Sequence, residues 1–374
     1  MKILIIVTKG GVGGAQVSVL NLARSLSVRG EKVAVGFGGG EFLEVKLAEN
    51  RIPFHIFNNL KRTHNPFRNL FFIFEIFFFL KKNKFDVAHF NSSNALFGAV
   101  GAKMAGVRTV FTFRGLSMLD ENYQASSLLK KIYYYFFKLL CFFVDEPVFV
   151  SEKNRVRAIN IGVIKNGTTI YNGLERSNLI FASRKEARTE LEKLTGSQLS
   201  GCYIIGSIGR LAYPKNYEFL IRMLPEILKI KPDAKAVIVG GGPEESRYES
   251  LISELGLVDR ILLAGEIHDA YRFIKAFELF VLPSAFEGLS ITLIEALFAG
   301  VPVLAANVGG NSELLSEEQL YKVNDKEDFL EKINKIISDE KLAFELAERN
   351  LEKSKNFELE RTAGKYLEIC KSKL

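Results

Sequence analysis

A chain of 374 residues is long enough for two domains of ordinary size, and 48% hydrophobic and 25% charged residues are typical of a folded globular protein. Its three cysteines, Cys141, Cys202 and Cys370, are widely separated, which excludes a disulfide framework and favours a reducing cytosolic compartment. The formal net charge of +7 divides into +12 on the first 173 residues and −5 on the rest. This basic first half can attract an anionic acceptor, an anionic membrane or nucleic acid, or it is simply a solvated lysine-rich surface.

The chain begins with a predicted β-strand. MKILIIVTKGG has a short apolar run followed by glycines, whereas a signal peptide would have a longer apolar core. Apolar strand-like runs then alternate with helical patterns to the end of the chain. The predicted strands are Ile3–Val7, Val33–Phe37, Phe54–Phe57, Val87–Phe90, Thr109–Phe113, Val148–Val150, Tyr203–Ser207, Ala236–Val239, Ile261–Leu263, Leu279–Leu282 and Pro302–Ala305. Because these are too many for one ordinary sheet, we predict two doubly wound α/β domains with parallel sheets.

A glycine-rich segment, KGGVGGA at Lys9–Ala15, follows the first strand. It lacks the Lys-Ser/Thr pair of a nucleoside triphosphatase loop, and Gln16 occupies the third glycine position of a dinucleotide fingerprint. What remains is a turn that opens a helix from Ala15 to Leu26. Such a turn either has no further role or brings backbone N–H groups, including those of Gly13 and Gly14, near a phosphate or an acceptor.

Two aromatic segments lie in the first half, within predicted helices at Phe67–Lys82 and Leu128–Val144. Charged residues interrupt both apolar runs, which fall short of the roughly 20 apolar residues that a membrane-spanning helix needs. We expect these helices to be buried or to lie on a surface. Lysines 81, 82 and 84 lie at the end of the first helix, and Lys130-Lys131 lie near the start of the second. Aromatic helices with such lysines suit peripheral contact with an anionic membrane. The alternative is that both are core helices.

The ends of two further strands carry polar side chains. His89 lies in the strand that ends at Asn91 and is interpreted as structural, whereas Arg114-Gly115 follows the next strand. An arginine stays protonated, so Arg114 cannot act as a general base, but it can hold a phosphate or a sugar hydroxyl. The composition turns polar at Tyr171–Leu174, where we place the domain boundary.

Two motifs of the second half point to a bound diphosphate. Arg210 and Lys215 lie on one loop just before a helix, where they can neutralise two phosphate groups or form a solvated surface pair. In LFVLPSAFEGLSITLIEALFAG, a buried strand is followed by Glu287-Gly288 and a helix that carries Glu295 about two turns in. Gly288 permits close approach of a ligand, and the N–H groups of Leu289, Ser290 and Ile291 form an anion site at the helix start. Glu295 has apolar neighbours, which argues against a solvent-facing residue, and a carboxylate there can accept hydrogen bonds from ribose hydroxyls.

Together these motifs resemble the donor-sugar region of retaining glycosyltransferases of family 4, which have the GT-B fold of two Rossmann-like doubly wound domains with an interdomain cleft. The resemblance implies that residues 1–173 bind the acceptor, that residues 174–357 bind a nucleotide sugar, and that the terminal helix in 358–374 crosses back to the first domain. It implies donor-binding roles for Gly13, Gly14, Arg210, Lys215, Gly288, Leu289, Ser290, Ile291 and Glu295, and catalytic roles for Glu287 and Arg114. Many members have His-Gly where this chain has Arg114-Gly115.

The implied reaction is metal-independent transfer from a UDP- or GDP-sugar, without a cofactor, to a glycan or polyprenyl-linked acceptor in the synthesis of cell-surface polysaccharide or glycoconjugates. The sequence contains no Asp-x-Asp and no His/Cys cluster with metal spacing. The expected location is cytoplasmic, with peripheral contact at the inner face of the membrane, and nucleic acid is not an expected partner. A GT-B-fold nucleotide-sugar epimerase and a non-catalytic sugar- or nucleotide-binding homologue remain as alternatives.

Overall fold

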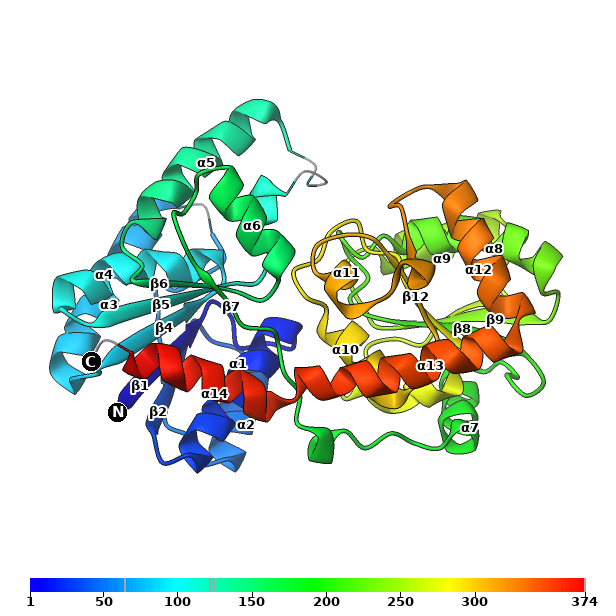
Figure 1. The fold of residues 1–374 in the computed structure, drawn as a ribbon, viewed down its shortest axis with the longest axis horizontal. Helices are drawn as coiled ribbons and strands as arrows, with labels where there is room; N and C mark the ends of the chain where they lie inside the picture. Colours follow the sequence, from blue (N-terminus) through cyan, green and yellow to red (C-terminus); the bar gives the residue numbers. More distant parts are fainter. Residues whose placement is uncertain (64, 121–122, 124, 373–374) are drawn as a thin grey trace. The chain divides into compact units, whose positions relative to one another are not determined.

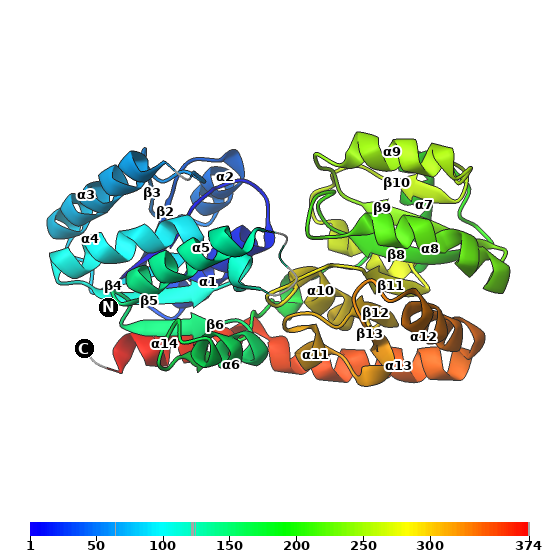
Figure 2. The same ribbon diagram turned by 90° about the horizontal axis from the view of Figure 1, so that it is seen from above.

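The computed structural model describes residues 1–63, 65–120, 123 and 125–372. The chain forms two compact units (Figures 1 and 2): unit 1 comprises Met1–Glu175 together with Phe357–Leu374, and unit 2 comprises Arg176–Asn356. Each unit is a parallel sheet covered by helices on both faces, which confirms the predicted α/β class with two doubly wound sheets.

Unit 1 contains a sheet with the strand order β3-β2-β1-β4-β5-β6-β7, all parallel. Its strands are β1 (Lys2–Val7), β2 (Lys32–Phe37), β3 (Phe54–Ile56), β4 (Val87–Asn91), β5 (Arg108–Phe113), β6 (Glu146–Phe149) and β7 (Thr168–Thr169). The order reverses between β1 and β4. In open α/β sheets, ligands bind at the carboxyl ends of the strands beside such a reversal, so this edge of unit 1 is the place to look for a site.

The helices of unit 1 form two layers. One face of the sheet is covered by α1 (Gly14–Val28), α2 (Glu41–Glu49) and the terminal helix α14 (Leu359–Lys371); the other by α3 (Pro66–Asn83), α4 (Phe97–Ala105), α5 (Ser127–Cys141) and α6 (Glu152–Asn160). The terminal helix packs beside α1 because Ala363, Tyr366 and Cys370 are buried in the core of that face. Residues far apart in sequence therefore share one core in unit 1.

Unit 2 contains a second parallel sheet, with the order β10-β9-β8-β11-β12-β13. Its strands are β8 (Tyr203–Ile208), β9 (Ala234–Val239), β10 (Ile261–Leu263), β11 (Leu279–Leu282), β12 (Val303–Ala306) and β13 (Leu320–Tyr321). Its helices are α7 (Arg184–Thr195), α8 (Tyr217–Ile230), α9 (Glu245–Glu254), α10 (Ile291–Ala299), α11 (Asn311–Leu314), α12 (Lys326–Ser338) and α13 (Glu340–Ser354). The sequence did not predict β7 and β13, because a strand of two residues is too short to show a period.

The outer faces of α3 and α5 are apolar as well as their inner faces. Phe67, Phe71, Phe74 and Phe78 are 44–70% exposed and recur every three or four residues along α3. The outer side of α5 carries a similar exposed stripe of Leu128, Ile132, Tyr135, Leu139 and, just beyond its end, Phe142. Among the described residues, every helix is too short or too polar to cross a membrane. Each of these two helices therefore has two apolar faces: one packs on the core of unit 1, and the other lies in solvent.

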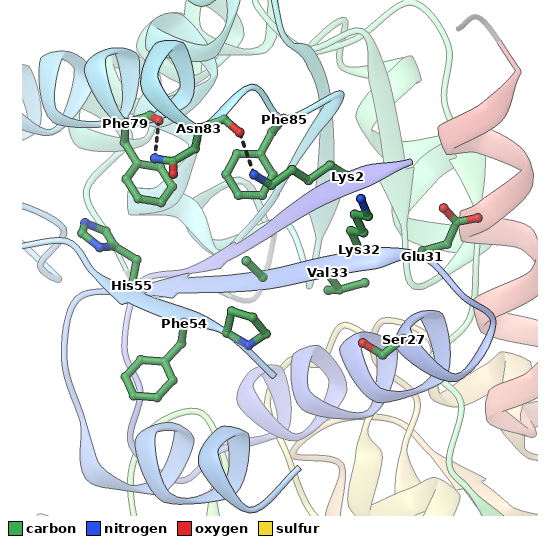
Figure 3. A pocket seen from close by; sticks show the side chains of 12 residues that line it. Lys2, Ser27, Glu31, Lys32, Val33, Phe54, His55, Phe79, Asn83 and Phe85 are labelled. Atoms are coloured by element: carbon green, nitrogen blue, oxygen red, sulfur yellow. Dashed lines mark hydrogen bonds between the residues drawn. The ribbon is translucent and has the colours of Figure 1, made fainter. Parts of the chain in front are cut away.

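A hollow of about 600 Å³ lies at the amino ends of β1 and β2 (Figure 3). The side chain of Lys2 donates to the carbonyl of Asn83 at 2.7 Å and lies over the ring of Phe85, while His55 stacks on Phe79. None of the predicted site residues lines this hollow. The hollow lies at the amino ends of these strands, whereas ligands of such sheets bind at the carboxyl ends.

Candidate functional site

Three loops meet at the carboxyl ends of β8, β11 and β12 in unit 2. The N–H of Ala285 donates to the carbonyl of Pro214 at 2.8 Å, and the N–H of Gly310 donates to the carbonyl of Gly288 at 2.8 Å. Gly309 has φ +49°, and a Cβ placed there would lie 1.8 Å from the carbonyl oxygen of Glu287. Gly309 is thus required for the close packing of this loop on the Glu287-Gly288 turn.

The two predicted phosphate-binding cations differ in their surroundings. Lys215 Nζ lies 2.8 Å from Glu287 Oε1, and Ser284 Oγ donates to the same oxygen at 2.7 Å. Arg210 is exposed, and its guanidinium has no partner among the described residues. Of these two cations, Arg210 is therefore free with respect to the described residues, and Lys215 is held by a carboxylate on the loop after β11.

The helix that follows this turn starts later than predicted. The helix α10 begins at Ile291 with Ser290 as its N-cap, so Leu289 and Ser290 precede it and Glu295 lies little more than one turn in, not two. Residues 283–290 form the loop that packs against the two neighbouring loops, so the helix begins only after this loop ends. The N–H groups of Ser290, Ile291 and Thr292 have no hydrogen-bond partner within the described part of the chain, which leaves a helix N-terminus open to an anion.

Glu295 is half-buried between apolar neighbours of α10 and forms no hydrogen bond to another described residue. Burial, and secondly the carboxylate of Asp269, raise the pKa of Glu295 to about 8, while the Lys215 cation partly offsets them. The Glu295 carboxyl is thus a partly buried polar group without a hydrogen-bond partner among the described residues, and a bound ligand can supply one. Asp269 was not predicted, because it lies on a separate loop before the short helix Ala270–Ala276.

In unit 1 the glycine-rich segment lies at the reversal point of the sheet. Gly13 is the N-cap of α1 and Gly14 its first residue, and Gln16 Nε2 donates back to the carbonyl of Lys9 at 3.0 Å. The hydroxyls of Thr8 and Ser92 lie 2.5 Å apart and join the end of β1 to the end of β4. The N–H groups of Gly14, Ala15 and Gln16 at the start of α1 have no partner among described residues, so this loop also presents open donors.

Arg114 is fixed beside this point by two asparagines. Its Nε and Nη2 donate to Asn91 Oδ1 at 3.2 and 2.8 Å, and its Nη1 donates to Asn172 Oδ1. Neither asparagine has a role that the sequence alone reveals: Asn91 ends β4 and Asn172 follows β7, so only the sheet brings them to Arg114. A weak signal in the sequence was that Asn91 lies at the end of a strand and Asn172 shortly after one.

His89 is structural in this fold. Its Nε2 lies 2.7 Å from Thr112 Oγ1, which lies 2.8 Å from the hydroxyl of Tyr366 on the terminal helix. Burial, helped by the Arg114 cation, lowers the pKa of His89 to about 3, so its imidazole is neutral at physiological pH. The buried His89–Thr112–Tyr366 chain holds α14 against the sheet.

Among the described residues, unit 2 thus carries an open helix N-terminus, an exposed arginine and an unsatisfied carboxyl after the strands of one sheet, groups that can bind an anion and hydroxyls. Residues 12–178 match the family described as Glycosyltransferase Family 4, and residues 197–354 match Glycosyl transferases group 1. This chain belongs to the family 4 glycosyltransferases and has the GT-B fold.

Similar proteins include a UDP-Gal:alpha-D-GlcNAc-diphosphoundecaprenol alpha-1,3-galactosyltransferase of Escherichia coli, 28% identical over 70% of this chain and 69% of that protein. The O-antigen biosynthesis glycosyltransferase WbnH of Escherichia coli is 27% identical over 79% of this chain and 80% of its own. The crystal structure of Anabaena HepE in complex with UDP and glucose superposes with a TM-score of 0.85 over 100% of both chains, at 23% identity. The chain is thus an enzyme of the glycosyltransferase class, and its fold is that of the solved GT-B proteins.

Proposed function

We propose that this protein transfers a sugar, with retention of anomeric configuration, from a UDP-linked donor on unit 2 to a lipid-linked acceptor on unit 1. The observation that carries the donor assignment is the coincidence at one edge of unit 2 of the open α10 N-terminus, the free Arg210 and Lys215. Uridine is the proposed nucleotide because the E. coli galactosyltransferase uses UDP-Gal by its name and the HepE structure holds UDP. GDP-sugars are the alternative donors.

The proposed roles follow from charge and position. Arg210, Lys215 and the N–H groups of Ser290 and Ile291 hold the diphosphate, Gly288 allows its close approach, and Glu295 accepts hydrogen bonds from the ribose. Leu289 belongs to the same turn. In unit 1, Gly13 and Gly14 lie at the start of α1, where N–H groups can bind an anion. Because protein groups supply the positive charge at the diphosphate, we propose that transfer needs no metal ion.

In the proposed reaction, the bond between the anomeric carbon and the diphosphate oxygen breaks as an acceptor hydroxyl bonds to the same face of that carbon. The proton of the hydroxyl passes to the departing diphosphate, which leaves as the nucleoside diphosphate. Glu287 uses Oε1 for Lys215 and Ser284, so Oε2 is left for a sugar hydroxyl near the developing positive charge. Glu287 thereby couples the position of the sugar to that of the phosphate-binding lysine.

A donor screen tests this function directly. UDP and GDP sugars are titrated into the full chain by calorimetry, and the positive donors are then assayed with a diphosphate-linked lipid acceptor. The product's anomeric configuration is read by NMR. Occupancy at a hundred times the dissociation constant stabilises the fold by about 2.7 kcal/mol, so thermal shift is a suitable first readout. A chain that binds no nucleoside diphosphate contradicts the donor assignment. Binding without transfer identifies the non-catalytic alternative, and an epimer formed from donor alone identifies the epimerase.

We further propose that the outer faces of α3 and α5 rest on an anionic membrane at the cytoplasmic side. Both helices belong to the layer on one face of the sheet of unit 1, and each carries an exposed apolar stripe. Exposed lysines flank the stripes: Lys81 and Lys82 in the last turn of α3, and Lys131 and Lys138 on α5. Apolar side chains with flanking lysines suit the interface of an anionic bilayer, where each lysine contributes about 1 kcal/mol.

Co-sedimentation with vesicles tests this surface. We expect Phe67→Ser combined with Phe71→Ser to reduce binding to vesicles rich in phosphatidylglycerol, while Phe344→Ser leaves it unchanged, because Phe344 is 66% exposed on α13 of unit 2. Binding of the unaltered chain should weaken as salt rises. Equal sedimentation of the double variant and the Phe344 control, or no binding at low salt, contradicts the membrane surface and favours a soluble acceptor.

A further inference from the structure

Arg114 is a cation with no counter-ion in the part of the chain that the structure describes. Its hydrogen bonds go to two neutral amide oxygens, those of Asn91 and Asn172, and it forms no ion pair with any described residue. Two ionisable side chains that interact with it electrostatically are His89 and Tyr366. Since the pKa of His89 is lowered and burial raises that of Tyr366, both are neutral near pH 7. A largely buried charge held in this way is costly unless a ligand offsets it.

The guanidinium still has donors to offer. An arginine has five N–H groups, and the contacts to Asn91 and Asn172 use three of them, so two remain. The amide nitrogen Nδ2 of Asn91 is buried and has no hydrogen-bond partner. The side chain of Arg114 keeps partial exposure, so a ligand can reach it. The site thus combines a fixed positive charge with unused donors from two side chains.

Position connects this site to the substrate of unit 1. Arg114 follows β5 and Asn91 ends β4, the strand beside the reversal of the sheet, where Ser92 bonds to Thr8 ahead of the glycine-rich segment. A sugar hydroxyl alone does not account for an arginine here, since an asparagine or glutamine would bind it without burying a charge. An oxyanion does, because it offsets the charge and matches the geometry of a guanidinium.

We propose that Arg114 and Asn91 bind an oxyanion carried by the acceptor, with Asn172 as the positioning residue that orients the guanidinium. This inference rests on the proposed function, and it names the acceptor class as acidic. The oxyanion is a phosphate of a diphosphate-linked lipid or a carboxylate of an acidic sugar, two sources of the same chemistry. The donor's diphosphate is matched by Arg210, Lys215 and the start of α10 on unit 2.

The test measures anion binding apart from catalysis. The full chain is saturated with UDP to fill the donor site, and inorganic pyrophosphate is then titrated by calorimetry, with glucuronate as a second arm. Arg114→Met should weaken pyrophosphate binding at least tenfold, and Arg114→Lys, which keeps the charge but loses the planar fork, should have an intermediate effect. Arg62→Met, which removes an exposed arginine of the same unit, should bind as the unaltered chain does.

Each outcome either supports or overturns the anion site at Arg114. Equal pyrophosphate and glucuronate binding by the unaltered chain and Arg114→Met overturns the anion site and leaves Arg114 structural. Weaker UDP binding in Arg114→Met assigns the arginine to the donor and overturns the acceptor assignment. If Arg114→Met weakens the binding of only one of the two anions, the result supports the site. The affected anion then identifies the source as phosphate or carboxylate. If Arg114→Met does not fold, Arg114→Lys carries the test, and its UDP affinity reports that unit 2 is intact. UDP binding by the unaltered chain tests the proposed function separately.

Discussion

Lys215 Nζ and Glu287 Oε1 lie 2.8 Å apart and join the loop after β8 to the loop after β11. Both side chains are 20% exposed or less, so this is not a loose surface pair. The lysine assigned to the diphosphate is therefore already in place before a donor binds, with its charge held by the carboxylate assigned to the sugar.

Replacing Lys215 should weaken donor binding. Lys215→Ala removes a charge-assisted hydrogen bond to the diphosphate and leaves Glu287 without its partner, so we expect a loss of about 1.5–3 kcal/mol in UDP affinity by calorimetry. Lys229→Ala, on the exposed side of α8, is the matched control and should cost nothing. Unchanged UDP affinity in Lys215→Ala would remove this lysine from the phosphate site.

Glu295→Gln should bind UDP more weakly, by about 1 kcal/mol or more, because it loses charge-assisted hydrogen bonds to the ribose. The difference should grow between pH 7 and 9, since the pKa of Glu295 is raised to about 8 and the unaltered side chain becomes a full carboxylate over that range. Calorimetry at several pH values measures both effects. A constant ratio of affinities across this range would show that the carboxylate does not contact the nucleotide.

The same pKa shift predicts a stability difference in the empty protein. The pKa of Glu295 lies at about 8 in the fold and 4.5 in its ordinary state, so its contribution is fully favourable below pH 4.5 and is lost as the pH rises to 8. Glu295→Gln removes this loss, and its free energy of unfolding should exceed that of the unaltered chain by at least about 1 kcal/mol at pH 8.5. Denaturant unfolding at pH 5 and 8.5 checks this; a variant less stable at both values would contradict it.

Gly309 should not tolerate alanine. A Cβ there would meet the carbonyl oxygen of Glu287 at 1.8 Å, so the Glu287-Gly288 turn must move. We expect Gly309→Ala to lower the free energy of unfolding by about 1–3 kcal/mol and to weaken UDP binding. Gly196→Ala is the matched control, since Gly196 also has a positive φ but has no atom within 4 Å of the added Cβ. Equal effects of the two substitutions would show that only backbone strain is at work.

Transfer should continue in excess EDTA, because Arg210, Lys215 and the α10 N-terminus supply positive charge at the diphosphate. Initial rates are compared with EDTA, with added magnesium and with added manganese, at matched ionic strength. We expect rates within about twofold of one another. A strict requirement for a divalent ion would count against the roles given to these two cations.

The sequence by itself determined the fold class and indicated where to propose the donor region. Continuous apolar strands alternating with helical periods predict parallel sheets, since strands covered on both faces have no polar side. The donor region is local: Arg210 and Lys215 share one loop, and Glu287 to Glu295 is one turn and its helix. Chain neighbours stay neighbours in space, so the sequence showed that the residues of each motif lie together, and the resemblance to family 4 suggested a phosphate site there.

Only the tertiary structure decided which distant residues meet. Arg114 is held by Asn91 and Asn172, Tyr366 closes a chain with Thr112 and His89, and Gly309 packs on Glu287. These contacts join loops that follow different strands, and no local period records which strands are adjacent. The lack of a counter-ion for Arg114 among the described residues and the raised pKa of Glu295 are likewise properties of the whole surroundings, because the cost of a buried charge depends on every group around it.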